Sequence, residues 1–160
     1  MICKKILTFV LLLTGLSAHA TVDSAQMSAW INEAVVETYT YQYDNYVERQ
    51  KVFAHYFTAE AWIGYIKALN ESKLLDVVKK NKYSVSAVAT MPPTITASVS
   101  HHWKAVMPLL VRYQNPQVQQ KQFLDVAVDF TEVPSDQGVR GLAITSIQVK
   151  KTTRPCQCTK

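Results

Sequence analysis

The stretch "LLDVVKKNKYSVSAVATMPP", residues 74–93, contains the change of hydrophobic period that decides the fold. Before Asn81 the apolar residues recur every three or four positions, as they do on one face of an α-helix. After it the period becomes two, the pattern of a half-buried strand, and Pro92 and Pro93 mark a turn. One face of this strand is formed by Tyr83, Val85, Ala87 and Ala89. The first half of the chain is therefore predicted to be helical and the second half β-rich.

Four helical segments are predicted upstream of residue 82. Asp23 or Ser24 can cap the first, and Thr58 can cap the third. The second covers residues 45–57, and the fourth is the short segment 71–81. Their apolar stripes comprise Met27, Trp30, Ile31, Ala34 and Val35 in the first, Tyr46 with Val52 or Phe53 and Tyr56 or Phe57 in the second, Trp62, Ile63, Ile66 and Leu69 in the third, and Leu74, Leu75 and Val78 in the fourth.

The stretch "ETYTYQYDNYVE", residues 37–48, joins the first two helices and holds four tyrosines. Residues 38–41 alternate as in a strand, but Tyr39, Tyr43 and Tyr46 continue the helical stripe. Asn45, with Glu48 three residues later, matches a capping box. We therefore predict a helix that weakens over residues 38–44 and restarts at Asn45, with the tyrosine rings in the core. Tyr41 lies off the stripe and is the candidate for an exposed ring.

Strands are also predicted at residues 94–103, 104–113, 123–133 and 141–151. Pro108 lacks an N–H group, which confines its strand to a sheet edge or a bulge. In the fourth strand the buried face is Leu124, Val126, Val128 and Phe130. Helices followed by an antiparallel sheet indicate an α+β fold. We expect the N-terminal helices on the concave face of a curved sheet of about four to five strands, forming one cone-like domain.

The first twenty residues have the features of a secretory signal peptide. A basic start, an apolar run at 6–16 and the sequence "SAHA" predict cleavage after Ala20. The run is shorter than the roughly 20 residues that a membrane span needs, so we expect no transmembrane helix in the mature chain. The predicted organisation is a signal peptide at 1–20, a single domain at 21–150 and a flexible tail at 151–160. The predicted location is periplasmic, with secretion beyond the periplasm as the alternative.

Charge argues against a nucleic-acid partner. Cleavage removes Lys4 and Lys5 from 17 basic residues and leaves all 12 acidic ones, so the mature net charge is +3. The remaining lysines are scattered, whereas nucleic-acid surfaces carry a clustered basic stripe.

The tail contains Cys156 and Cys158, which an oxidising compartment allows to form a disulfide. A bridge across one intervening residue closes a small, strained ring. Intermolecular pairing and a tail without any structural role remain the alternatives.

No pattern in the chain specifies catalysis, a metal or a cofactor. Asp125 and Asp129 are separated by about 13 Å along a strand, too far for a glycosidase pair. His101 and His102 are adjacent in a predicted strand and would point to opposite faces. His55 is not part of an HExxH motif, and nucleophile and phosphate-binding motifs are absent from the sequence. We expect a protein that is not an enzyme.

Three segments together resemble the DotI/IcmL family of type IVB secretion systems: "WINEAVVETYTYQYDNY", "YFTAEAWIGYIKALNESKLLDVV" and "HHWKAVMPLLVRYQN". The resemblance runs from Trp30 to about Ile147. Its most specific residues are Tyr39, Tyr41, Asn45, Tyr46, Tyr56, Phe57, Thr58, Trp62, Trp103, Pro108 and Tyr113.

The resemblance implies a periplasmic domain related to the cone of nuclear transport factors and ketosteroid isomerases. It also implies a structural role in an inner-membrane subcomplex, with secretion-apparatus proteins as partners and possible homo-oligomers. No catalytic residues come with it. Members of the apparatus carry a membrane-spanning helix before the domain, where this chain has a predicted signal peptide. The alternative function is small-molecule binding or isomerase-like chemistry, with Tyr41, Asp44 or His101 at a pocket in the cone.

Overall fold

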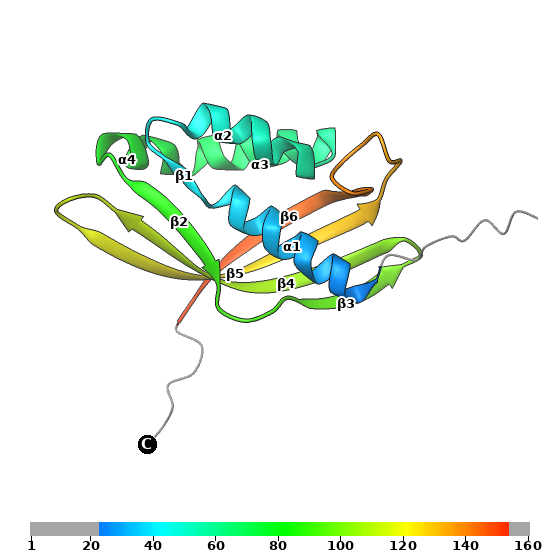
Figure 1. Ribbon diagram of the computed structural model, residues 1–160. Helices are drawn as coiled ribbons and strands as arrows, with labels where there is room; N and C mark the ends of the chain where they lie inside the picture. Colours follow the sequence, from blue (N-terminus) through cyan, green and yellow to red (C-terminus); the bar gives the residue numbers. More distant parts are fainter. Residues whose placement is uncertain (1–22, 154–160) are drawn as a thin grey trace, which may run out of the picture.

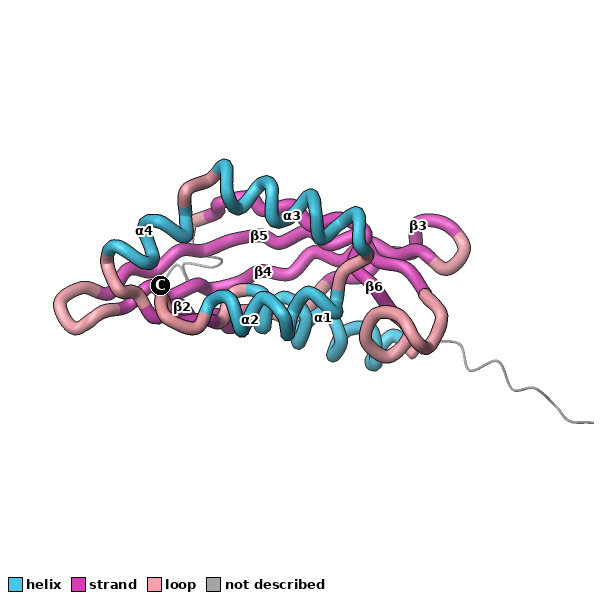
Figure 2. Tube along the Cα trace, turned by 90° about the horizontal axis from the view of Figure 1, so that it is seen from above, coloured by secondary structure: helices cyan, strands magenta, loops and turns pink. Residues whose placement is uncertain are grey.

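The computed structural model of the protein describes residues 23–153 and places four α-helices on the same side of one antiparallel sheet (Figure 1). This arrangement confirms the predicted α+β class. The helices are α1 (Ser24–Thr38), α2 (Tyr46–Phe53), α3 (Ala59–Glu71) and α4 (Leu74–Lys80), and a short 3-10 helix, η1 (Ala54–Tyr56), follows α2. Seen from above, α3 and α2 run over different strands of the sheet (Figure 2).

The sheet has six strands: β1 (Tyr41–Gln42), β2 (Ser84–Ala89), β3 (Thr94–Val99), β4 (His102–Gln114), β5 (Gln119–Glu132) and β6 (Leu142–Thr152). Its order is β1-β2-β4-β5-β6, and β3 also pairs with β4. Five strands match the predicted ones, whereas β1 was not predicted. The last strand, β6, extends two residues beyond the domain boundary predicted at residue 150.

Pro108 does not lie on an edge strand, because β4 has partners on both sides. On one side β4 pairs with β5 along its whole length, and on the other β2 pairs with Leu109–Gln114 and β3 with His102–Val106. Pro108 lies between these two stretches, where its carbonyl accepts the N–H of Thr90 at 2.9 Å. A strand residue directs its N and C=O to the same side. The missing N–H therefore faces the gap between β2 and β3, which explains why proline is tolerated in a central strand.

Alternation along β4 and β5 separates the two faces of the sheet. The predicted inward face of β5 is confirmed, since Leu124, Val126, Val128 and Phe130 are all buried. Asp125 and Asp129 fall on the opposite, convex face, as expected. His101 is not in a strand: it occupies the turn before β4 with a φ of 59°, and its Nδ1 lies 2.5 Å from Glu132 Oε2.

Helices α1, α2 and α4 bury residues of their predicted stripes, whereas no residue of α3 is fully buried. The stripe of α1 is fully confirmed, and α4 buries Val78. In α2 the inward residue is Phe53 rather than Val52. The prediction for α3 was partly wrong, because Ile63 is 68% exposed and the contacts to the core come from Trp62, Tyr65 and Leu69.

No helix within residues 23–153 is both long and apolar enough to cross a membrane. The predicted signal peptide with its cleavage point, Cys156 and Cys158 lie outside the described residues.

Candidate functional site

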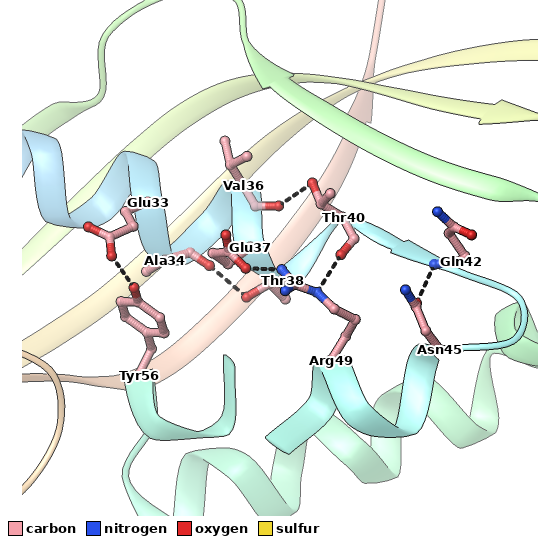
Figure 3. Close-up of polar contacts among 10 residues, drawn as sticks. All are labelled: Glu33, Ala34, Val36, Glu37, Thr38, Thr40, Gln42, Asn45, Arg49 and Tyr56. Atoms are coloured by element: carbon pink, nitrogen blue, oxygen red, sulfur yellow. Dashed lines mark hydrogen bonds and ion pairs between the residues drawn. The ribbon is translucent and has the colours of Figure 1, made fainter. Parts of the chain in front are cut away.

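The connection between α1 and α2 is fixed by side-chain hydrogen bonds to the backbone (Figure 3). At the end of α1, Thr38 and Thr40 each donate from Oγ1 to the carbonyl four residues earlier, Ala34 and Val36, at 2.7 Å. Arg49 of α2 donates to the Thr40 carbonyl at 3.3 Å and forms an ion pair with Glu37. The connection is therefore an ordered turn rather than a frayed helix.

Two details of this connection differ from the prediction. Tyr41 and Gln42 form β1, which pairs with Val85 and Ser84 of β2. The strand-like alternation was thus a real signal that the helical stripe obscured. Asn45 does precede α2, but its side chain does not cap the helix; Oδ1 accepts the N–H of Gln42 at 2.7 Å and closes the turn. By contrast, Thr58 caps α3 as predicted, accepting the N–H of Ala61.

Aromatic rings fill the end of the concave face where β4 begins, which we call the closed end. Phe130 of β5 lies between Trp30 of α1 and Trp103 of β4, with ring centroids 5.5 and 5.6 Å away. The indole N–H of Trp30 donates to the Val139 carbonyl at 2.8 Å. The Tyr56 hydroxyl, next to Trp30, donates to Glu33 at 2.5 Å, and Arg140 forms an ion pair with Glu33. These rings and polar contacts fill the concave face at this end.

The other end of the concave face, which we call the open end, contains a cavity of about 720 Å³. Its roof is α3, which presents the small residues Ala61, Gly64 and Ala68. Its floor is the first part of β5 and the later part of β6, where inward-facing Val149 is still 50% exposed. The cavity opens at a rim with two exposed charged residues, Glu60 and Lys151.

Four tyrosines from different elements line the open end: Tyr39 after α1, Tyr41 in β1, Tyr65 in α3 and Tyr113 in β4. Burial raises the pKa of all four phenols above the ordinary value of 10.0. The pKa values of Tyr39, Tyr41 and Tyr65 are raised further by neighbouring tyrosines. All four hydroxyls are therefore protonated at neutral pH, and each can both donate and accept a hydrogen bond.

The hydroxyls of these four tyrosines have free hydrogen-bonding capacity. Within residues 23–153, the only tyrosine hydroxyls bonded to protein atoms are those of Tyr46 and Tyr56. In the same part of the chain, no fully buried side-chain polar atom lacks a partner. The hydroxyls of the cavity must therefore be accessible to solvent through the open end.

The prediction that Tyr41 is an exposed ring is wrong. Its ring is only 4% exposed, because β1 turns it inward against Tyr46, with ring centroids 4.9 Å apart. Tyr43, which was predicted to lie on the buried stripe, is instead the exposed ring of the stretch, at 38%. Of the three groups considered for a pocket, Tyr41 lines the cavity, whereas Asp44 and His101 do not.

The residues that carried the family resemblance divide among several places. Tyr39, Tyr41 and Tyr113 line the cavity, and Tyr46 supports Tyr41 from behind. A second group connects η1 and α3 to the sheet: Phe57 forms a bridge with Ile144 of β6, and its ring contacts Trp62. The remaining motif residues act singly, with Tyr56 and Trp103 at the closed end, Asn45 and Thr58 at turns and Pro108 in β4.

Tyr65 was missed by the sequence analysis because it lies off the stripe assigned to α3. The spacing of Ala61, Gly64 and Ala68 was the available signal, since small residues three and four apart give a helix face that cannot fill the space beneath it. Within residues 23–153, no group of three or more His, Cys, Asp or Glu side chains is placed to bind a metal ion. The chemistry available in the cavity is therefore neutral hydrogen bonding beside apolar surface.

Comparisons with solved structures place this fold among secretion proteins. An IcmL-like type IV secretion system protein from Legionella pneumophila is 52% identical, with a TM-score of 0.82 over 85% of this chain and 98% of that one. The periplasmic domain of DotI is 31% identical, with a TM-score of 0.78 over 84% of this chain and 99% of that one. CagV, a VirB8 homologue from Helicobacter pylori, shares the fold at 11% identity, with a TM-score of 0.67 over 81% and 99% of the two chains.

A search of curated proteins found no match. The sequence itself matches a family described as the type IVb secretion system inner-membrane complex component, over residues 9–151. The matched region begins inside the predicted signal peptide and extends almost to the end of β6. The chain therefore belongs to the DotI/IcmL family of type IVB secretion system components.

Proposed function

We propose that this chain is a non-enzymatic interaction protein of a type IVB secretion apparatus and acts in the periplasm. The observation that supports this most strongly is the family match over residues 9–151, together with 52% identity to an IcmL-like secretion protein. The partners are other components of the apparatus, and self-association is part of the proposal.

Exposed apolar side chains on the helical layer support a role in protein contacts. Val47 and Val52 of α2 and Ile63 of α3 are between 47% and 68% exposed. Single exposed apolar residues are common on protein surfaces. The helical layer nevertheless offers apolar surface that a partner can cover, and Ile63 is the most exposed large apolar residue of the described chain.

Co-purification from the envelope of secretion-competent cells tests this function. We expect the tagged full-length chain to recover apparatus proteins identified by mass spectrometry, and deletion of its gene to reduce secretion. Ile63→Glu should reduce recovery, whereas Lys67→Glu, also exposed on α3, should reduce it less. Normal secretion after deletion, with no apparatus protein recovered, would show that the proposed role is wrong.

Export and the state of the tail are part of the same proposal. We propose that the chain is cleaved after Ala20 and that the mature protein is one domain followed by a short tail. Intact-mass measurement of the periplasmic fraction tests the cleavage site directly. Comparison with and without reductant distinguishes a Cys156–Cys158 bridge, which lowers the mass by about two hydrogens, from a disulfide-linked dimer. Recovery of the uncleaved chain from the membrane fraction would contradict the export part.

A further inference from the structure

We infer that the open end is a binding site for an uncharged amphiphile, a molecule with an apolar body and a hydroxyl or carbonyl group that meets the tyrosine hydroxyls. This inference goes beyond the proposed function and does not depend on it, because it rests on the shape and chemistry of the cavity alone.

The size of the cavity is the first reason. Its volume of about 720 Å³ lies within the range of roughly 300–1,000 Å³ that is usual for small-molecule sites. The cavity exists because α3 turns Ala61, Gly64 and Ala68 toward the sheet, and a Cβ added at Gly64 would meet no atom within 4 Å. At the closed end, formed by the same strands, tryptophan and phenylalanine rings occupy the concave face.

The chemistry of the walls defines the ligand. Leu124, Ile147 and Val149 form an apolar floor that an apolar body can cover. The hydroxyls of Tyr41 and Tyr65 have unused hydrogen-bonding capacity, which a hydroxyl or carbonyl group can satisfy.

The distribution of charged residues around the cavity favours an uncharged ligand. Among residues 23–153, the only charged residues that line the cavity, Glu60 and Lys151, are exposed at its rim. A charged group placed among the tyrosines would lose its hydration without gaining an opposite charge, which is strongly unfavourable. A neutral hydroxyl loses less hydration and regains hydrogen bonds from the phenols.

Fluorescence titration of the full chain with Nile red, an uncharged apolar dye, tests the site. We expect saturable binding of one dye per chain and its displacement by decan-1-ol. Decanoate has the same chain length but a carboxylate, and we expect it to displace the dye at least about tenfold less effectively. Equal displacement by the two compounds would overturn the assignment of an uncharged ligand.

Two variants locate the binding. Gly64→Leu fills the cavity from the roof without contacting other atoms at Cβ, so we expect Nile red binding to weaken at least about tenfold with no fall in melting temperature. Asn70→Leu adds the same side chain outside the cavity lining on α3 and should change binding less than about twofold. If Gly64→Leu binds Nile red as tightly as wild type, or if Asn70→Leu loses as much affinity as Gly64→Leu, the assignment of the binding site to this cavity is wrong.

A third variant tests the contribution of a tyrosine hydroxyl separately from the volume of the cavity. Tyr65→Phe keeps the ring and removes one hydroxyl, so decan-1-ol should bind about two- to tenfold more weakly. Tyr43→Phe removes a hydroxyl from the exposed ring of the α1–α2 connection and should leave binding unchanged. Equal affinities for wild type and Tyr65→Phe would contradict the role of that hydroxyl in recognition.

Discussion

The closed and open ends of the concave face use the same strands but differ in what the helices contribute. At the closed end, α1 places Trp30 on Phe130, so the two layers meet through large rings. At the open end, α3 offers Ala61, Gly64 and Ala68, and the sheet beneath is left partly uncovered. The difference shows that the size of the residues on a covering helix, rather than the curvature of the sheet alone, decides whether the interior is filled or hollow.

Truncation of Trp30 should have the largest effect on stability. Its side chain is 1% exposed and donates a partly buried hydrogen bond, so we expect Trp30→Ala to lower the free energy of unfolding by about 3–5 kcal/mol. Tyr39→Ala is the matched change at the open end and should cost clearly less, because the cavity already adjoins that ring. Urea denaturation measures both. Equal losses of stability in the two variants would contradict the difference in packing between the two ends.

The loop that carries Val139 should be the next most sensitive element. Gly138 has a φ of 63°, and a Cβ there would collide with the carbonyl oxygen of Leu142. We expect Gly138→Ala to cost about 2 kcal/mol or more. Gly141 also has a positive φ, 72°, but its nearest neighbour would be 3.6 Å away. Gly141→Ala should therefore cost about 1 kcal/mol. If thermal denaturation shows that Gly141→Ala is less stable than Gly138→Ala, the proposed collision at Gly138 is wrong.

A small gain in stability is expected at the open end. Gly64 lies inside α3, and a methyl group there meets nothing within 4 Å. Because glycine is a poor helix former, Gly64→Ala should raise the free energy of unfolding by about 0.5–1 kcal/mol. A loss measured by urea denaturation would indicate that the roof of the cavity is more tightly packed than the structure shows.

The smallest effect should be a pH dependence at the closed end. The pKa of Glu33 lies below its ordinary value of 4.5, chiefly because the Tyr56 hydroxyl donates to the carboxylate, with Arg140 adding to the effect against the opposing influence of burial. A lowered pKa means that the stabilisation is complete above the ordinary value and is lost as the pH falls through the folded-state value. Melting curves of Glu33→Gln should therefore fall below those of wild type at neutral pH, and the difference should shrink below about pH 4.5.

Tyr56→Phe provides the control for this pH dependence. It removes the principal donor to Glu33 and leaves the carboxylate in place. We expect it to reproduce most of the difference in melting temperature at neutral pH. A gap between Glu33→Gln and wild type that stays constant down to pH 3 would contradict the role of the charge.

Features that depend on the local period were predictable from the sequence. The change of period after Asn81 located the border between helices and sheet, and the alternation in β5 gave its buried face without error. These predictions succeed because one buried side imposes a period of 2 on a strand and 3.6 on a helix. Thr58 was also predictable, since capping depends on residues within one turn.

Features that depend on distant partners were not predictable in the same way. Tyr41 becomes buried only because β2 pairs with β1, and Pro108 is central only because β2 and β3 share one side of β4. Ile63 continues a helical stripe, yet the placement of α3 leaves it outside. The cavity depends on the separation of α3 from β6, of which the small residues of α3 were the one local sign.

The hydrogen bond from Trp30 to the Val139 carbonyl joins residues 109 positions apart in the chain. During synthesis α1 is made first, whereas the loop that accepts this bond and the last strand are made at the end. Until they appear, Trp30 has no carbonyl partner and Phe57 has no strand to join. A chain that ends before residue 139 therefore lacks both contacts and cannot complete its tertiary structure. Completion of the domain requires the final segment of the chain to meet its first helix.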